Sequence, residues 1–127
     1  ACWAHARRGF FEALTSATAE ASLVLAKIQR LYKVETEARE LALAAERVRT
    51  LRQEKSALIL ASIREDLDRL AKSALPKSPL GKAVAYALNL WTELTRYVED
   101  GRLAIDNNTA ERAMRGVAVG RKNWLFC

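Results

Sequence analysis

The chain of 127 residues is poor in cysteine and proline and has no long apolar run. Its two cysteines, Cys2 and Cys127, lie at opposite ends without a CxxC pair, which indicates neither a disulfide framework nor a zinc site. No apolar stretch approaches the roughly 20 residues that span a bilayer. Arg7 and Arg8 follow the first apolar residues at once, unlike a secretory signal. We therefore expect a protein of the reducing cytoplasm with no membrane partner.

Glycine and proline are also missing from residues 11–74, where Ala, Leu, Glu, Arg and Lys dominate. These residues are strong helix formers. Apolar residues recur there at helical spacing, at Ala21, Val24, Ile28 and Leu31 and again at Leu60, Ile63, Leu67, Leu70 and Ala74. A single helix of this length would measure about 100 Å, which a small domain cannot cover. The chain therefore either folds back or pairs with a second copy, and we place a turn at residues 41–46, where the apolar stripe is weak.

Two prolines, Pro76 and Pro79, end this long helical stretch. Ser78 followed by Pro79 predicts an N-cap and a proline at the first helical position. The helix that follows, at residues 79–99, carries its own apolar stripe and ends at Gly101. We expect this glycine to adopt the left-handed conformation that often terminates helices.

The remaining chain completes an all-α fold. Residues 103–105 form a short extended approach to a last helix at residues 109–115. No segment repeats the alternation of apolar and polar residues that is typical of strands. The sequence thus predicts a helical hairpin at residues 12–75 plus C-terminal helices.

The net charge of +6 is unevenly distributed. Residues 1–11 carry a charge of +2, residues 102–127 carry +3, and the long middle carries only +1. A polyanionic partner should therefore meet the two ends rather than the central helices. Because small basic proteins often bind no nucleic acid, charge alone does not establish such a partner.

Two motifs occupy these basic ends. The first is Cys-Trp-Ala-His-Ala-Arg-Arg-Gly-Phe-Phe at residues 2–11, and the second is Asp-Asn-Asn-Thr-Ala-Glu-Arg-Ala-Met-Arg at residues 106–115. Glu111 lies three residues after Asn108, which is the spacing of a capping box. From spacing alone a cap is the commoner role for Glu111, and a metal ligand is the alternative.

These motifs, in this order, resemble the insertion sequence 66 family of DDE transposases. The resemblance is dense in residues 2–11 and 77–126, with Gly9 standing where the family usually has lysine. It implies that Glu111 is one of the carboxylates of a two-metal site, the others being two aspartates on an RNase H-like sheet. In the family those aspartates precede the first motif, so we expect a fragment that lacks most of the sheet.

The resemblance also implies a division of the chain. Residues 1–11 would hold the end of a core strand and the start of a helix, residues 12–78 the helical insertion, and residues 79–127 the C-terminal helices. The function implied is DNA transposition by metal-dependent phosphodiester cleavage and strand transfer. Mg²⁺ would serve the complete enzyme, whereas this chain alone would bind no metal and be inactive. Its partners would be transposon ends and further copies of itself, near the bacterial nucleoid.

Several cations are candidates for contacting DNA phosphates: Arg7, Arg8, Arg112, Arg115, Arg121 and Lys122. Adjacent Arg7 and Arg8 point to different sides of a helix, so one can contact phosphate while the other pairs with an acid. Arg115 lies one turn beyond Glu111 and, without DNA, should pair with it.

The remaining side chains of note are expected to pack. His5, the only histidine, has no second ligand at helical spacing, which favours packing over metal binding. The charges of the middle segment should form a solvated helix face. The larger aromatic residues should be core anchors, although those near the ends should be under-buried if the sheet is absent: Trp3, Phe10, Phe11, Trp91 and Trp124.

Two other functions stay open. One is a non-enzymatic helical module that binds DNA through its basic ends. The other is a coiled-coil assembly protein in which residues 17–75 dimerise. Salt dependence of DNA binding separates them, because only phosphate contacts give a steep dependence.

Overall fold

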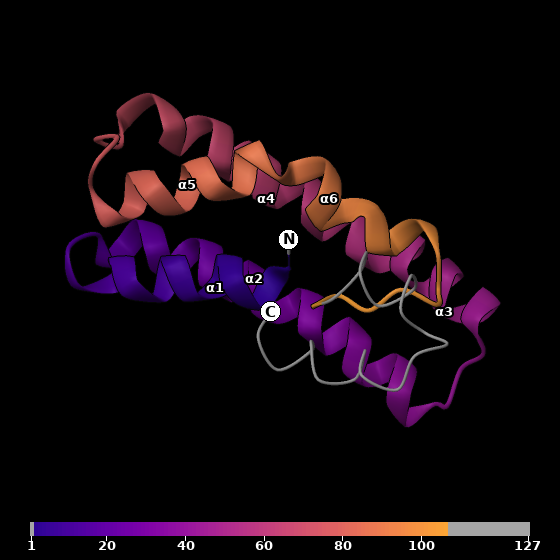
Figure 1. Ribbon diagram of the computed structural model, residues 1–127. Coiled ribbons are helices and arrows are strands. Elements are labelled where there is room, and N and C mark those ends of the chain that lie inside the picture. Colours follow the sequence, from indigo (N-terminus) through magenta and orange to yellow (C-terminus); the bar gives the residue numbers. More distant parts are fainter. Residues whose placement is uncertain (1, 107–127) are drawn as a thin grey trace, which may run out of the picture.

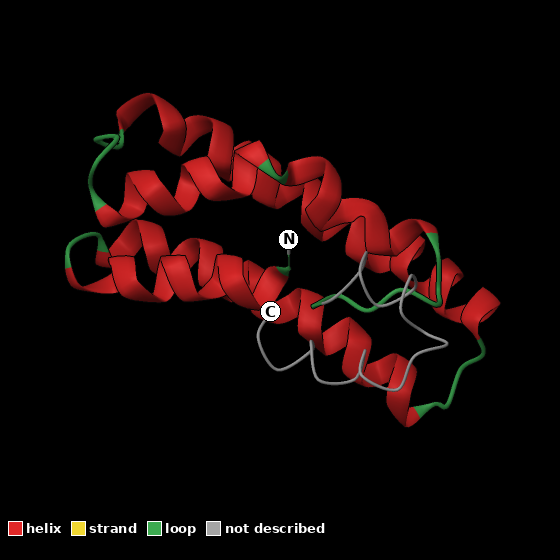
Figure 2. Ribbon diagram, viewed as in Figure 1, coloured by secondary structure: helices red, strands yellow, loops and turns green. Residues whose placement is uncertain are grey.

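The computed structural model describes residues 2–106, which fold into helices joined by short turns (Figures 1 and 2). No β-strand occurs within this range, so the predicted all-α fold is confirmed for it. The predicted helix at residues 109–115 lies outside the described residues. In chain order the elements are α1 (Trp3–Glu12), η1 (Ala13–Thr15), α2 (Thr18–Glu40), α3 (Ala45–Leu51), the π-helical η2 (Arg52–Ser56), α4 (Ala57–Ser73), α5 (Pro79–Asn89), α6 (Trp91–Thr95) and η3 (Arg96–Glu99).

The hairpin turns where the sequence predicted. α2 ends at Glu40 and α3 begins at Ala45. Between them Ala42 has a φ of 51°, and the amides of Ala42 and Leu43 donate to carbonyls of the last turn of α2 at 3.0 and 3.1 Å. This pair of bonds is the Schellman ending, in which glycine normally occupies the left-handed position. Because alanine takes that position here, no glycine marked the turn in the sequence.

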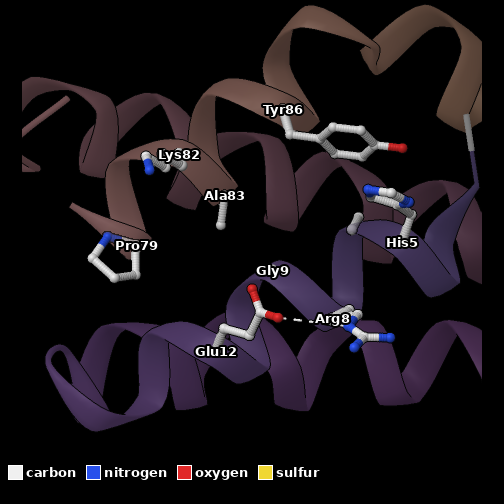
Figure 3. A pocket seen from close by; sticks show the side chains of 9 residues that line it. His5, Arg8, Gly9, Glu12, Pro79, Lys82, Ala83 and Tyr86 are labelled. Carbon is white, nitrogen blue, oxygen red and sulfur yellow. Dashed lines mark ion pairs between the residues drawn. The ribbon is translucent and has the colours of Figure 1, made fainter. Parts of the chain in front are cut away.

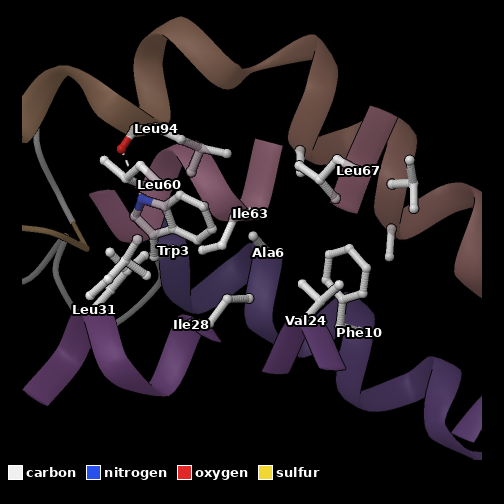
Figure 4. Close-up of a cluster of buried hydrophobic side chains, with 14 of the residues drawn as sticks. Trp3, Ala6, Phe10, Val24, Ile28, Leu31, Leu60, Ile63, Leu67 and Leu94 are labelled. Atoms are coloured by element: carbon white, nitrogen blue, oxygen red, sulfur yellow. Dashed lines mark hydrogen bonds between the residues drawn. The ribbon is translucent and has the colours of Figure 1, made fainter. Parts of the chain in front are cut away.

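The core lies between helices that are distant in sequence (Figure 4). α1 packs on α2 and α5, and α4 packs on the same two helices. The predicted apolar stripes face inward in this bundle, and their buried members are Ala21, Val24, Ile28 and Leu31 from α2 and Leu60, Ile63, Leu67 and Leu70 from α4. One chain therefore covers its own stripe, so a second copy is not required to bury residues 17–75.

The aromatic residues of α1 are more deeply buried than predicted. Trp3 and Phe10 are fully buried, which confirms them as core anchors but contradicts the expectation of under-burial. The reason is that α1 packs against both α2 of the helical insertion and α5 after it. The indole Nε1 of Trp3 donates to the Leu94 carbonyl at 2.8 Å, and its ring meets Trp91 edge-on at 5.9 Å. Phe11, by contrast, is 65 % exposed.

The segment after the hairpin begins as predicted but does not continue as one helix. Ser78 Oγ accepts a hydrogen bond from the Gly81 amide at 3.0 Å, and Pro79 is the first helical residue. The predicted helix at 79–99 is broken at Leu90, whose ψ of 21° leaves the helical range. The break separates α5 from α6 and η3, which bury Leu94 and Tyr97 in the core.

Gly101 does not adopt the predicted left-handed conformation, because no glycine within residues 2–106 has a positive φ. The reason for glycine is instead a close approach. A Cβ at Gly101 would lie 1.9 Å from the Ala45 carbonyl oxygen. The missing side chain therefore lets the loop after η3 touch the start of α3. No described helix is long and apolar enough to cross a membrane.

Candidate functional site

The two sequence motifs meet at the N-terminus of α1. Asp106, the first residue of the second motif, directs its Oδ1 at the Ala4 amide, 2.9 Å away. The same oxygen accepts a hydrogen bond from the Tyr32 hydroxyl on α2. Ala4 and Asp106 are 102 positions apart in the chain. The fold thus joins both motifs at one point in space.

This contact follows from the chemistry of a helix end. The first amides of a helix have no partner within the helix, and its dipole favours a negative charge there. Cys2, at the N-cap position of α1, forms no side-chain cap. Asp106 supplies the missing acceptor from a distant segment. The Oδ1 atom of Asp106 consequently accepts hydrogen bonds from both a backbone amide and a phenol.

Tyr32 links this cap to an arginine of the first motif. Burial and the hydrogen bond to Asp106 raise the pKa of Tyr32, so the neutral phenol is the donor. The Arg7 guanidinium lies over the Tyr32 ring at 5.8 Å while its side chain remains exposed. We call Arg7, Tyr32 and Asp106, together with the Ala4 amide, the junction cluster.

Arg8 points away from the junction cluster, as the adjacent positions of the two arginines predicted. Its Nε lies 3.5 Å from Glu12, one turn along α1, and its side chain is 79 % exposed. Figure 3 shows this pair beside the ring of His5. His5 stacks on Tyr86 of α5, with ring centroids 4.8 Å apart and 20° between the planes. His5 therefore packs, as predicted.

The interpretation of the middle charges as a solvated face is wrong for two networks. Arg52 is buried and binds both carboxylate oxygens of Glu35, at 3.0 and 2.7 Å. Its Nη1 donates to the carbonyls of Tyr97 and Asp100 at 2.7 and 3.2 Å. The π-helical η2 changes the helical register and directs Arg52 and Ser56 inward. Nothing in the sequence marked this segment as π-helical.

A second network lies on regular α-helices and was also missed. Asp66 is buried on α4 and pairs with Lys27 of α2 at 2.6 Å and with Arg69 at 3.0 Å. In these pairs, cations and carboxylates of the middle segment neutralise one another inside the hairpin. Only their spatial neighbours distinguish these residues from solvated ones.

Most of the predicted site lies outside the described residues. These positions are Glu111, Arg112, Arg115, Arg121 and Lys122. Of the predicted site residues, only Arg7 and Arg8 lie within the described range. The structure adds Tyr32 and Asp106 to the candidate site. The one signal for them in the sequence was the position of Asp106 at the start of the second motif.

Comparison with known proteins agrees with this arrangement of motifs. The family described as "Transposase IS66 family" matches residues 1–127. The chain belongs to the IS66 transposase family. No solved structure matches the IS66 chain.

Relatives of the IS66 chain include longer proteins of Sinorhizobium fredii (strain NBRC 101917 / NGR234). Uncharacterized protein y4qI is 39 % identical over 98 % of this chain and 23 % of its own length. Uncharacterized protein y4jD is 34 % identical over 98 % of this chain and 24 % of its own length. The IS66 chain thus spans about a quarter of the length of these relatives.

Proposed function

We propose that this chain is the part of an IS66 transposase that carries a metal-binding carboxylate, Glu111, and holds it beside the helical insertion. The observation that supports this proposal is the capping of α1 by Asp106. Glu111 follows Asp106 by five positions, so the cap anchors the start of the segment that bears the glutamate. A carboxylate that must meet a scissile phosphate requires such a fixed base.

The reaction proposed for the whole protein is phosphodiester cleavage followed by strand transfer. Water and then a DNA 3′-hydroxyl would attack phosphorus at a two-metal site built from several carboxylates. Residues 2–106 bring together no group of three His, Cys, Asp or Glu residues that could hold a metal. The described part therefore does not fit a Mg²⁺ site of its own, and we assign it no step at the metal. Its proposed roles are anchoring Glu111 and contacting DNA.

The proposed DNA contacts lie at the basic ends of the chain: Arg7, Arg8, Arg112, Arg115, Arg121 and Lys122. Arg7, a member of the junction cluster, and Arg8, the next residue on α1, support this placement because both are exposed. Many cations of the hairpin are instead held by carboxylates of neighbouring turns or helices. We further propose that the protein acts on chromosomal DNA in the bacterial cytoplasm.

Self-association is a further part of this proposal. It rests on large apolar side chains that the described bundle leaves at its surface: Phe11, Leu23, Leu41, Leu58 and Leu75. Sedimentation velocity across a concentration series measures it, and a chain that stays monomeric throughout would contradict it.

Strand transfer by the complete protein tests the central proposal. We expect Glu111→Gln to abolish Mg²⁺-dependent joining of transposon-end DNA, while Glu54→Gln, an exposed glutamate of η2, leaves it intact. The 127-residue chain alone should neither cleave nor join DNA. Persistent strand transfer by the Glu111→Gln protein would show that Glu111 is not a metal ligand.

A further inference from the structure

A cleft of about 330 Å³ lies between α1 and α5, away from the junction cluster (Figure 3). Its floor forms where Gly9 of α1 meets Ala83 of α5, since a Cβ at Gly9 would lie only 3.3 Å from the Ala83 Cβ. The stacked rings of His5 and Tyr86 close one end. The cleft is therefore built from side chains of two helices that are about 70 positions apart in the chain.

Positive charge from both helices lines this cleft. Arg8 projects from α1 and Lys82 from α5, and Glu12 is the single carboxylate in the lining. Lys82 is exposed and forms no ion pair within residues 2–106. Two cations facing one acid leave a net positive charge in a concave site, which favours an anion.

The one carboxylate holds Arg8 only loosely. The pair joins a single nitrogen to a single oxygen at 3.5 Å, and the side chains of Arg8 and Glu12 are 79 % and 65 % exposed. Exposed pairs of this kind contribute about 0–1 kcal/mol. Since Arg8 makes no other polar contact within the described range, its remaining guanidinium N–H groups can bind an incoming oxyanion.

We propose that this cleft binds one phosphate of the DNA backbone, held between the guanidinium of Arg8 and the ammonium of Lys82. Arginine offers a planar fork to phosphate oxygens, and lysine adds a point charge from the opposite wall. The inference rests on the proposed function and adds Lys82, which neither motif indicated.

Fluorescence anisotropy with a labelled DNA duplex in a salt series tests the cleft. The variant is Arg8→Gln with Lys82→Gln, and the matched control is Arg30→Gln with Lys33→Gln, two exposed cations between α2 and α4. Because the cleft is proposed to bind one phosphate, the cleft variant should lower the salt-dependence slope by about 0.9. The control should change the slope by less than half of that. Circular dichroism should show unchanged thermal unfolding for both, because all four side chains are exposed.

Glu12→Gln provides a test of opposite sign. Removing the carboxylate that competes for Arg8 should tighten DNA binding, and weaker binding would overturn the proposal. Equal slopes for the cleft variant and its control would also overturn it and would favour an acidic protein segment as the occupant. If the unmutated chain shows no salt-dependent binding at all, the DNA contacts of the proposed function fail as well. The two failures are thus distinguishable.

Discussion

Asp106 caps a helix that begins 103 positions earlier, at Trp3. Its carboxylate accepts hydrogen bonds from the Ala4 amide at 2.9 Å and from the Tyr32 hydroxyl. One side chain therefore ties the second motif to α1 and α2 at once. In the sequence, Glu111, the proposed metal ligand, follows Asp106 by five positions.

Removal of the cap should destabilise the fold. We expect Asp106→Ala to lower the free energy of unfolding by about 1–2 kcal/mol, because the α1 amide loses its acceptor and Tyr32 loses its partner. Urea unfolding measures this loss. Asp68→Ala is the control, because Asp68 is exposed and pairs with Arg64 one turn away, and it should cost less than about 0.5 kcal/mol. Equal losses would contradict the capping role.

The junction cluster should also make stability sensitive to high pH. The ordinary pKa of tyrosine is 10.0, and burial together with Asp106 raises that of Tyr32. Above about pH 10 the unfolded chain releases this proton while the folded chain retains it, so stability is full below pH 10 and falls as the pH rises. In urea unfolding at about pH 8–11, which brackets the ordinary tyrosine pKa, the free energy of unfolding of Tyr32→Phe should fall less steeply with pH. An unchanged slope would contradict the buried, hydrogen-bonded phenol.

Two ion pairs between α2 and η2 should differ in energy. The Glu35–Arg52 pair is buried, whereas the Glu37–Lys55 pair is exposed, at 39 % and 51 %. We expect Arg52→Met to cost about 3–5 kcal/mol, because Glu35 is left charged without its partner. Lys55→Met should cost less than about 1 kcal/mol. Chemical denaturation compares them, and similar costs would show that Glu35 is not effectively desolvated.

Two glycines should respond differently to alanine. Gly101→Ala places a methyl 1.9 Å from the Ala45 carbonyl oxygen, and we expect the resulting shift to cost about 1–3 kcal/mol. Gly9→Ala meets only the Ala83 side chain and backbone, with the Cβ at 3.3 Å, and the gain of about 1 kcal/mol in helix propensity offsets that contact. Thermal unfolding should therefore separate the two variants. A stable Gly101→Ala protein would refute the close approach.

The basic ends should dominate DNA binding. Neutralising Arg112, Arg115, Arg121 and Lys122 together should weaken binding and flatten its salt dependence, by about 0.9 in slope for each phosphate that is no longer bound. The comparison is a quadruple variant of exposed hairpin cations that form no ion pair within residues 2–106: Arg30, Lys33, Arg47 and Lys72. Filter binding across a salt series measures both. A greater loss of affinity in the hairpin variant would place the DNA surface on the insertion instead.

Local features of the sequence were enough to predict the helical hairpin, its turn and the start of α5. The composition of residues 11–74 predicted the hairpin, and its weak stripe predicted the turn that Ala42 makes. Ser78 and Pro79 predicted the start of α5. In each case the determining interactions span only a few residues, such as a helical period or a side chain that caps its own helix.

Tertiary structure alone decided which charges are buried and what caps α1. Arg52 looks like any other cation of the hairpin until η2 directs it at Glu35, 17 positions away. Asp106 heads a motif that has its own local helix signals, yet its partners are Ala4 and Tyr32. A buried charge or a cap from a distant segment depends on which groups the fold brings within hydrogen-bonding distance. Periodicity cannot contain that information, because it describes a residue's own helix and not the helix that packs against it.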